Sequence, residues 1–187
     1  FYKDKHTGSY GKLSTLSFNG NKIITTGGGG MVLTNDEKLA KRAKHVTTTA
    51  KIQHEWAFNH DEVGFNYRLP NLNAALGLAQ IESLDVYLCS KRKIAKDYQK
   101  WGDENGLEFI KEPDKTKSNY WLNIVIAEDK KQRNLMLQTT NKNKVTTRPA
   151  WTPMHKLEMN LECFQGDLKN TEWLSERLLC VPSSAKT

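Results

Sequence analysis

The chain has 187 residues, 37% of them hydrophobic and 26% charged, with a net charge of +7, a pI near 9.2 and a mean hydropathy of −0.67. That length can bury a core for one domain or one and a half, and no run of about 18 apolar residues is present to cross a membrane. Basic and acidic residues are interspersed, and the sequence has no aromatic-basic pattern of the kind found in nucleic-acid-binding proteins. The charge therefore argues against nucleic-acid binding and favours a lysine-rich soluble surface.

The three cysteines, Cys89, Cys163 and Cys180, are odd in number and have no CxxC spacing. This pattern fits neither a disulfide framework nor a zinc site, so we expect a reducing, cytoplasmic location and no bound metal. The chain opens on Phe1 and closes at Thr187 without a terminal helix pattern. We expect it to be the C-terminal half of a longer protein.

The first predicted elements are two short buried strands, at 13–18 and 30–34, on either side of a turn. A helix should follow, with a capping box from Thr34 to Glu37. Its apolar stripe is formed by Leu39, Ala40, Ala43 and Val46. Residues 47–66 show no clear period, and long irregular segments are often functional.

A long helical pattern opens at Pro70 and continues to Gly106. It is too long for one compact globular helix, so we expect two helices or a bend near 83–85, passing from one domain to the next. Beyond it the sequence predicts strands at 121–126 and 145–151 and helices at 130–141 and 173–179. Strands and helices alternate, which indicates an α/β or α+β class.

Lys22 stands out because it follows a Gly-Asn turn, between two apolar segments and five residues before a four-glycine run. A lysine held beside partly buried strands loses its proton more easily than a solvated one, and a neutral amine attacks carbonyl groups. Glycines let backbone approach a bound group closely. From spacing alone, a solvated surface lysine is the better interpretation, since this chain has many lysines.

Two blocks of sequence resemble the DegT/StrS sugar aminotransferases. The first is SFNGNK at 17–22 with TTGGGGMVLT at 25–34, and the second is HDEVGFNYRLP at 60–70 with NAALG at 73–77. The resemblance implies an α/β fold of the PLP-dependent transferase type (fold type I, aspartate aminotransferase-like). Residues 1–85 would belong to the PLP-binding large domain, and residues 86–187 to the small α+β domain.

The resemblance also implies the site residues. Lys22 would be catalytic and carry pyridoxal 5′-phosphate as a Schiff base, and its amine, once released, would act as general acid and base. Ser17 would bind the cofactor phosphate, and Asn66 would reach the phosphate of the neighbouring subunit's cofactor. Their structural alternatives are a strand serine and a turn asparagine.

His60, Arg148 and His155 are candidates for binding the sugar nucleotide, because Arg suits a diphosphate and His can bond sugar hydroxyls. Each is an equally reasonable surface or packing residue. The glycine run lacks the spacing of a phosphate-binding Walker loop, and we interpret it as a tight turn under the cofactor or a flexible hairpin. Trp56, Phe58 and Trp151 suit a base or sugar face but more often pack in a core or interface.

The function that the resemblance implies is amino-group transfer, with glutamate as the expected donor, to a keto sugar nucleotide in surface-polysaccharide biosynthesis. The closest likeness is to the branch that aminates UDP-linked 4-keto-6-deoxy-N-acetylhexosamines. A homodimer would share its active sites. The alternatives are a sugar dehydratase relative, which has histidine in place of Lys22, and a non-catalytic or regulatory binding protein with a decayed site.

Overall fold

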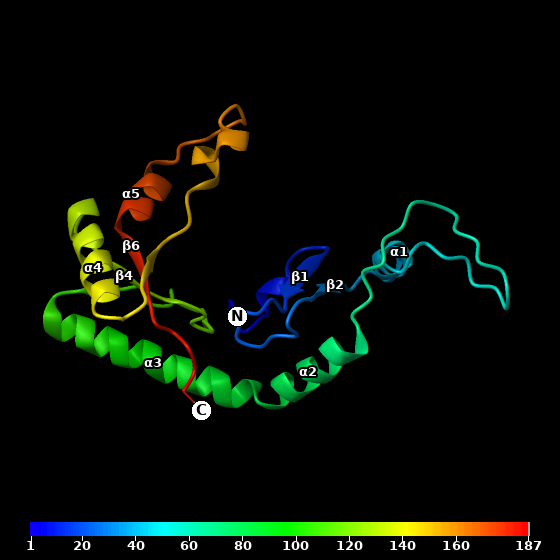
Figure 1. Cartoon of the computed structure of the whole chain (residues 1–187), viewed down its shortest axis with the longest axis horizontal. Coiled ribbons are helices and arrows are strands. Elements are labelled where there is room, and N and C mark those ends of the chain that lie inside the picture. The colour runs from blue at the N-terminus through cyan, green and yellow to red at the C-terminus, as the bar shows by residue number, and fades with distance from the viewer. Residues whose placement is uncertain (187) are drawn as a thin grey trace. The chain divides into compact units, whose positions relative to one another are not determined.

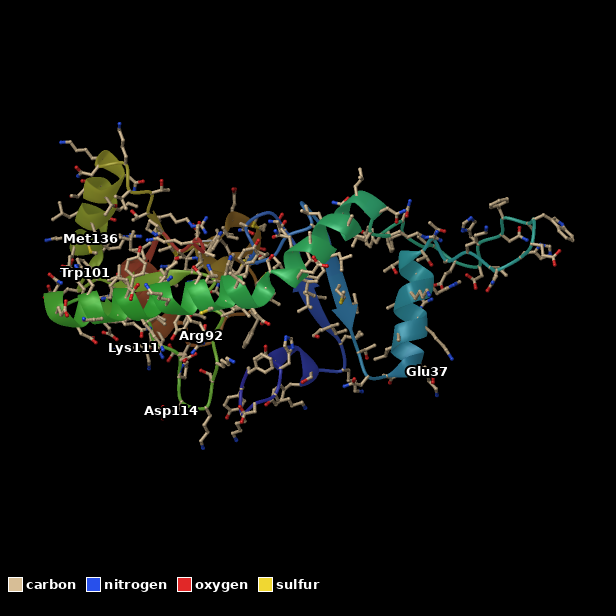
Figure 2. The ribbon with its side chains drawn as sticks, turned by 90° about the horizontal axis from the view of Figure 1, so that it is seen from below. Glu37, Arg92, Trp101, Lys111, Asp114 and Met136 are labelled. Carbon is tan, nitrogen blue, oxygen red and sulfur yellow. The ribbon has the colours of Figure 1, made fainter. Side chains whose placement is uncertain are left out.

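The computed structural model describes residues 1–186 (Figure 1). These residues form two compact units, one made of Phe1–Val86 with Asp114–Ser118, the other of Tyr87–Pro113 with the described residues from Asn119 onward. Each unit has its own sheet, of two strands in the first unit and four in the second. The assignment of residues 1–85 and 86–187 to a large and a small enzyme domain stays a prediction.

The first unit is built on a hairpin of β1 (Ser14–Ser17) and β2 (Gly30–Leu33), preceded by the 3-10 turn η1 (Thr7–Ser9). The strands pair antiparallel, in a register that sets Ser14 opposite Leu33. The expectation of buried strands is wrong for this chain, because Met31 and Val32 remain 49% and 48% exposed. A two-stranded sheet has no second layer of its own and is marginally stable by itself.

Helix α1 spans Glu37–Thr47, and its N-cap is Asp36. The Asp36 carboxylate accepts hydrogen bonds from the backbone N–H groups of Lys38 and Leu39, at 2.8 and 3.1 Å. The predicted capping box from Thr34 is therefore wrong: the Thr34 hydroxyl donates to the Lys12 carbonyl instead, at 2.7 Å. A carboxylate satisfies two amides and also complements the helix dipole, so Asp36 is the better cap.

Residues 48–66, which we call the arm, contain no helix and no multi-residue strand, as predicted. Two isolated bridges, Thr48 with Asn66 and Lys51 with His60, fold the arm back on itself. Figure 1 shows the arm, coloured cyan to green, running out beyond α1 and returning to the start of α2.

Helices α2 (Asn71–Glu82) and α3 (Leu84–Asn105) follow, with Pro70 as the N-cap of α2. The break falls at Ser83, which confirms the predicted division of the long helical pattern. Although α3 has 22 residues, no helix within residues 1–186 is both long and apolar enough to cross a membrane.

The second unit has an antiparallel sheet in the order β3-β4-β6-β5. The strands are β3 (Glu108–Phe109), β4 (Asn123–Ile126), β6 (Leu178–Val181) and β5 (Arg148–Pro149). The unit also contains helices α4 (Lys130–Lys142) and α5 (Lys169–Arg177). Two 3-10 turns, η2 (Met154–Lys156) and η3 (Glu158–Asn160), lie between β5 and α5. Phe109, Val125 and Leu179 form the core. Side chains of α3 and α4 pack against it, among them Tyr98 and Met136.

This unit differs from the sequence predictions at three elements. The helix expected at 173–179 ends at Arg177, because the next residues form the inner strand β6, where Leu179 is fully buried. The strand expected at 145–151 is reduced to two residues, since Pro149 has no N–H to donate. Strand β3 was not predicted, and two residues carry too little pattern to reveal it.

Candidate functional site

Lys22 lies at a tight turn in the loop between β1 and β2, as predicted. Its backbone N–H donates to the Asn19 carbonyl at 3.0 Å, which closes the turn around Gly20 and Asn21. The residue is half-buried. This position fixes where the side chain leaves the backbone.

Phe18 holds the two ends of the Lys22 loop together. Its N–H donates to the Gly29 carbonyl at 2.9 Å, and its carbonyl accepts from the Thr26 N–H at 3.0 Å. The Thr25 hydroxyl donates to the same carbonyl, also at 3.0 Å. The loop that carries Lys22 is thus closed at its base by backbone hydrogen bonds rather than left as an open excursion.

Helix α2 anchors the residues that follow Lys22. The Asn73 side-chain amide donates to the Thr26 carbonyl at 2.6 Å, and the Thr25 N–H donates to the Gln80 side-chain oxygen at 3.3 Å. Thr26 is 3% exposed, and a Cβ added at Gly77 would come within 2.9 Å of its methyl group. The sequence analysis assigned no role to Asn73 or Gln80. Asn73 belongs to the NAALG block of the resemblance, whereas no sequence pattern identified Gln80.

The glycine run forms the predicted tight turn. Gly27 and Gly29 have φ angles of +79° and +136°, which L side chains rarely adopt. A Cβ at Gly29 would also lie 2.9 Å from Leu69, whereas one at Gly28 would meet nothing within 4 Å. Gly28 therefore leaves open space beside the backbone. That this space lies under a cofactor stays a prediction.

Ser17 and Asn66 offer the donors that a phosphate requires. The Ser17 hydroxyl oxygen accepts from the Asn19 N–H at 3.4 Å, and its own proton has no acceptor within residues 1–186. The exposed Asn66 amide makes no side-chain hydrogen bond to any residue that the structure describes. With the Lys22 amine, these groups fit an aldehyde that carries a phosphate. Their binding roles stay predictions.

His60 lies on the arm, six residues before Asn66. Its Nδ1 is 2.7 Å from the Thr49 carbonyl, and because a carbonyl only accepts, Nδ1 carries the proton. Nε2 is left as an acceptor, without a partner in the described part of the chain. A ligand hydroxyl could therefore donate to it, and this role too stays a prediction.

The first unit has a cavity of about 800 Å³ beside these residues rather than around them. Its lining comes from the hairpin, α1 and residues 67–70, and includes Leu16, Gly28, Lys44 and Arg68. Lys22, Ser17 and Asn66 are not part of the lining. The structure therefore places Lys22 and Ser17 on one hairpin and His60 and Asn66 on the arm, without enclosing them in one pocket.

Arg148 and His155 lie in the second unit. The Arg148 guanidinium lies over the Trp151 ring, 4.9 Å from its centre, and Trp151 stacks on Trp121 at 6.1 Å. His155 Nε2 is 3.4 Å from Glu172, and its side chain is only 12% exposed. Their substrate roles stay predictions, and the engagement of His155 with α5 gives it a packing role as well.

Glu172 is the acidic centre of the small cluster around His155. Hydrogen bonds from Lys156 and then from His155 lower the pKa of its carboxyl group. The Lys156 ammonium lies 3.2 Å from the carboxylate. The cluster is exposed at Glu172, so it ties η2 to α5 but does not form a buried acid–base pair.

The comparisons with known proteins agree on one family. The sequence model of the DegT/DnrJ/EryC1/StrS aminotransferase family matches residues 1–187. GDP-perosamine synthase of Escherichia coli O157:H7 is 38% identical over 88% of the chain and 44% of its own length. The putative pyridoxal phosphate-dependent aminotransferase EpsN of Bacillus subtilis is 33% identical over 98% of the chain and 48% of its length.

A solved structure confirms the fold. Helicobacter pylori PseC, an aminotransferase involved in the biosynthesis of pseudoaminic acid, superimposes with a TM-score of 0.92 at 23% identity, over all of the chain and 52% of PseC. The predicted fold class, a PLP-dependent transferase of fold type I, is confirmed. The chain spans about half the length of the curated relatives it matches.

The cofactor that these matches indicate is pyridoxal 5′-phosphate, and the amine, hydroxyl and amide described above suit it chemically. If Lys22 is the cofactor lysine, as the resemblance implies, it argues against the dehydratase alternative, and this role stays a prediction. The chain belongs to the DegT/DnrJ/EryC1/StrS aminotransferase family.

Proposed function

We propose that this chain is part of a PLP-dependent aminotransferase that moves an amino group, from glutamate as donor, to a keto sugar nucleotide. The observation that carries the proposal is the placement of Lys22 on a closed turn anchored by α2, in a chain matched over its whole length by an aminotransferase family. The half that the relatives carry in addition would supply the rest of the site.

In the proposed enzyme, the cofactor supplies the electron sink for both halves of the reaction. Lys22 would hold the cofactor covalently through its side-chain amine. When free, the Lys22 amine would take the proton from Cα of the amino acid, and it would later deliver a proton to the sugar carbon that receives the amino group. The closed loop keeps this amine in place for both transfers.

Ser17 and Asn66 would hold the phosphate of the cofactor through charge-assisted hydrogen bonds. Ser17 donates from the end of β1, within reach of the same loop that carries Lys22. Asn66 donates from the arm, and we propose that it does so to the site of a second copy of the chain. His60 Nε2 would accept a hydrogen bond from a substrate hydroxyl.

A homodimer accounts for the composition of the arm. Its apolar side chains are strongly exposed, with Trp56 at 75%, Phe58 at 77% and Val63 at 83%. Neighbouring exposed aromatic residues are typical of an interface. A second copy, placed by a two-fold axis, would cover both arms and bring each Asn66 to the other copy's site.

The acceptor sugar has two candidates. The blocks around Lys22 and His60 favour a UDP-linked 4-keto-6-deoxy-2-acetamido sugar, aminated at carbon 4. The names of two relatives, the GDP-perosamine synthases of Escherichia coli O157:H7 and Vibrio cholerae at 38% and 34% identity, favour a GDP-linked keto sugar. Both carry a diphosphate, which suits Arg148 and the net charge of +7.

Borohydride reduction and peptide mapping of the full-length enzyme with PLP test the site. We expect the adduct on Lys22, and loss of turnover in Lys22→Ala with the sugar nucleotide still bound. Lys12→Ala is the matched control, since Lys12 lies just before the same hairpin. An adduct on Lys12 or Lys51, or full turnover in Lys22→Ala, would overturn the assignment.

A panel of ketosugar nucleotides with glutamate as donor tests the substrate. Amination of the UDP-linked N-acetyl sugar alone supports the first candidate, and amination of the GDP-linked sugar alone supports the second. A complete enzyme that forms the Lys22 adduct but aminates no ketosugar would favour the binding or regulatory alternative.

A further inference from the structure

We propose that Arg42 and His45 of α1, paired with Asp61 and Glu62 of the arm, are positioning residues that hold Asn66 and His60 for ligand binding. We call these four residues the arm latch. The inference rests on the proposed function, because it concerns how the arm presents its ligand-binding groups.

The arm latch consists of an Arg–carboxylate ion pair and an adjacent contact between a histidine and two carboxylates. The Arg42 guanidinium donates hydrogen bonds to both oxygens of the Glu62 carboxylate. Nη2 lies 2.6 Å from Oε2, and Nη1 contacts Oε1. His45 Nε2 lies 2.6 Å from Asp61 and 3.6 Å from Glu62. Arg42 and His45 are three residues apart, so they share one face of α1. A planar, two-point contact fixes orientation as well as distance.

The two carboxylates of the arm latch lie between His60 and Asn66 in the sequence, so the latch can orient both ligand-binding side chains of the arm. Asp61 and Glu62 directly follow His60 and come five and four residues before Asn66. Backbone hydrogen bonds to the last two residues of α1 follow, from Phe65 N–H to Val46 O at 2.7 Å and from Tyr67 N–H to Thr47 O at 2.9 Å. The tip of the arm, by contrast, is exposed at Trp56 and Phe58. The contacts of residues 61–67 with α1 therefore determine the orientation of the arm relative to that helix.

The latch is a charge-paired anchor rather than a metal site. His45, Asp61 and Glu62 place their ligand atoms within 4.8 Å of one another, which is close enough for an ion. However, Arg42 already occupies both Glu62 oxygens with a positive charge. A hydrogen bond from His45 is the main cause of the lowered pKa of the Asp61 carboxyl group, and hydrogen bonds from Arg42 are the main cause for Glu62.

A charge-swap experiment on the full-length enzyme tests the positioning role. Arg42→Glu should set two carboxylates against each other and release the arm. We expect hydrogen exchange at the Phe65 and Tyr67 amides to accelerate, and PLP to dissociate about tenfold faster. The double variant Arg42→Glu with Glu62→Arg should restore both. His45→Gln, which keeps a neutral hydrogen-bond donor, gives a milder version if Arg42→Glu does not fold.

The matched control is the swap of Lys41 and Glu37, an exposed pair on the same helix at 2.7 Å, which should change neither readout. Faster exchange with unchanged PLP dissociation would overturn the positioning role, as would failure of the double swap to restore dissociation. These outcomes differ from failure of the proposed function itself, which would show as no Lys22 adduct in the unmodified enzyme.

Discussion

At the scale of single residues, the four-glycine run contains two different kinds of glycine. Gly29 combines a φ of +136° with only 2.9 Å of room for a Cβ, whereas Gly28 has neither constraint. Gly29→Ala should therefore destabilise the protein by about 1–3 kcal/mol. Gly28→Ala should be close to neutral or slightly stabilising, because it restricts only the unfolded chain.

Chemical denaturation of the two glycine variants checks this contrast. PLP affinity gives a second readout: if the open side of Gly28 faces the cofactor, Gly28→Ala lowers affinity while leaving stability unchanged. Equal stability losses for the two variants would contradict the backbone geometry described above.

The sequence predicted the position of Lys22 but not what holds it. The turn, the glycines and the first of the two resembling blocks all lie within about a dozen positions of Lys22. Its anchors do not: Asn73 lies 47 residues from Thr26, and Gln80 lies 55 residues from Thr25. Local pattern cannot pair such residues, because their contact depends on how α2 packs against the hairpin.

At the scale of elements, the contact between α2 and the Lys22 loop predicts a coupled loss. Asn73→Ala removes the amide that satisfies the carbonyl of the buried Thr26, at a cost of about 1–3 kcal/mol in unfolding free energy. Because the same bond fixes the loop, the rate of adduct formation at Lys22 should also fall. Asn71→Ala, at the exposed first residue of α2, is the control and should change neither quantity.

Helix α3 contains a buried lysine whose charge should appear in the pH dependence of stability. Lys91 is 5% exposed and donates to the Ser183 and Trp121 carbonyls, at 2.5 and 3.1 Å. Burial lowers its pKa, so between the folded and unfolded pKa values the unfolded chain binds more protons. The contribution of Lys91 to the unfolding free energy therefore rises with pH through that window.

Burial also raises the pKa values of Tyr98 and Cys180, whose contributions fall as the pH rises through their unfolded values. Comparison with Lys91→Met separates the effects, since that variant should lose only the rising part. Lys93→Met, exposed on the same helix, should keep the profile of the unmodified protein. Identical alkaline profiles for all three proteins would show that Lys91 does not titrate differently on folding.

Elements with a long local period were predicted well, whereas strands β3, β5 and β6 were missed or predicted with the wrong type or length. The division at Ser83 and the position of α4 follow from apolar spacing over many residues. Strands β3 and β5 have two residues each, and β6 reads as a helical continuation of α5. Strands β3 and β6 are defined by pairing with β4, and β5 is defined by pairing with β6. Such pairing joins residues far apart in the sequence, so local pattern does not reveal it.

At the scale of the whole molecule, the exposed arm predicts association of two copies. Trp56 and Phe58 expose about three quarters of their surface, and burying side chains of this size contributes about 1.5–3 kcal/mol each. Replacing both with serine should therefore raise the dimer dissociation constant by about two orders of magnitude or more. Because Asn66 would act in the partner's site, activity should fall in parallel with the dimer population.

Sedimentation of the full-length enzyme over a range of concentrations, with turnover measured at the same concentrations, checks this prediction. Phe164→Ser is the matched control, since Phe164 is 98% exposed but lies in the second unit, away from the arm in sequence. A sharper test mixes two inactive variants, Lys22→Ala and Asn66→Ala. If the sites are shared, mixed dimers contain one site with both residues intact and regain part of the activity. A fully active monomer, or no recovery in mixtures that form dimers, would show that each copy completes its own site.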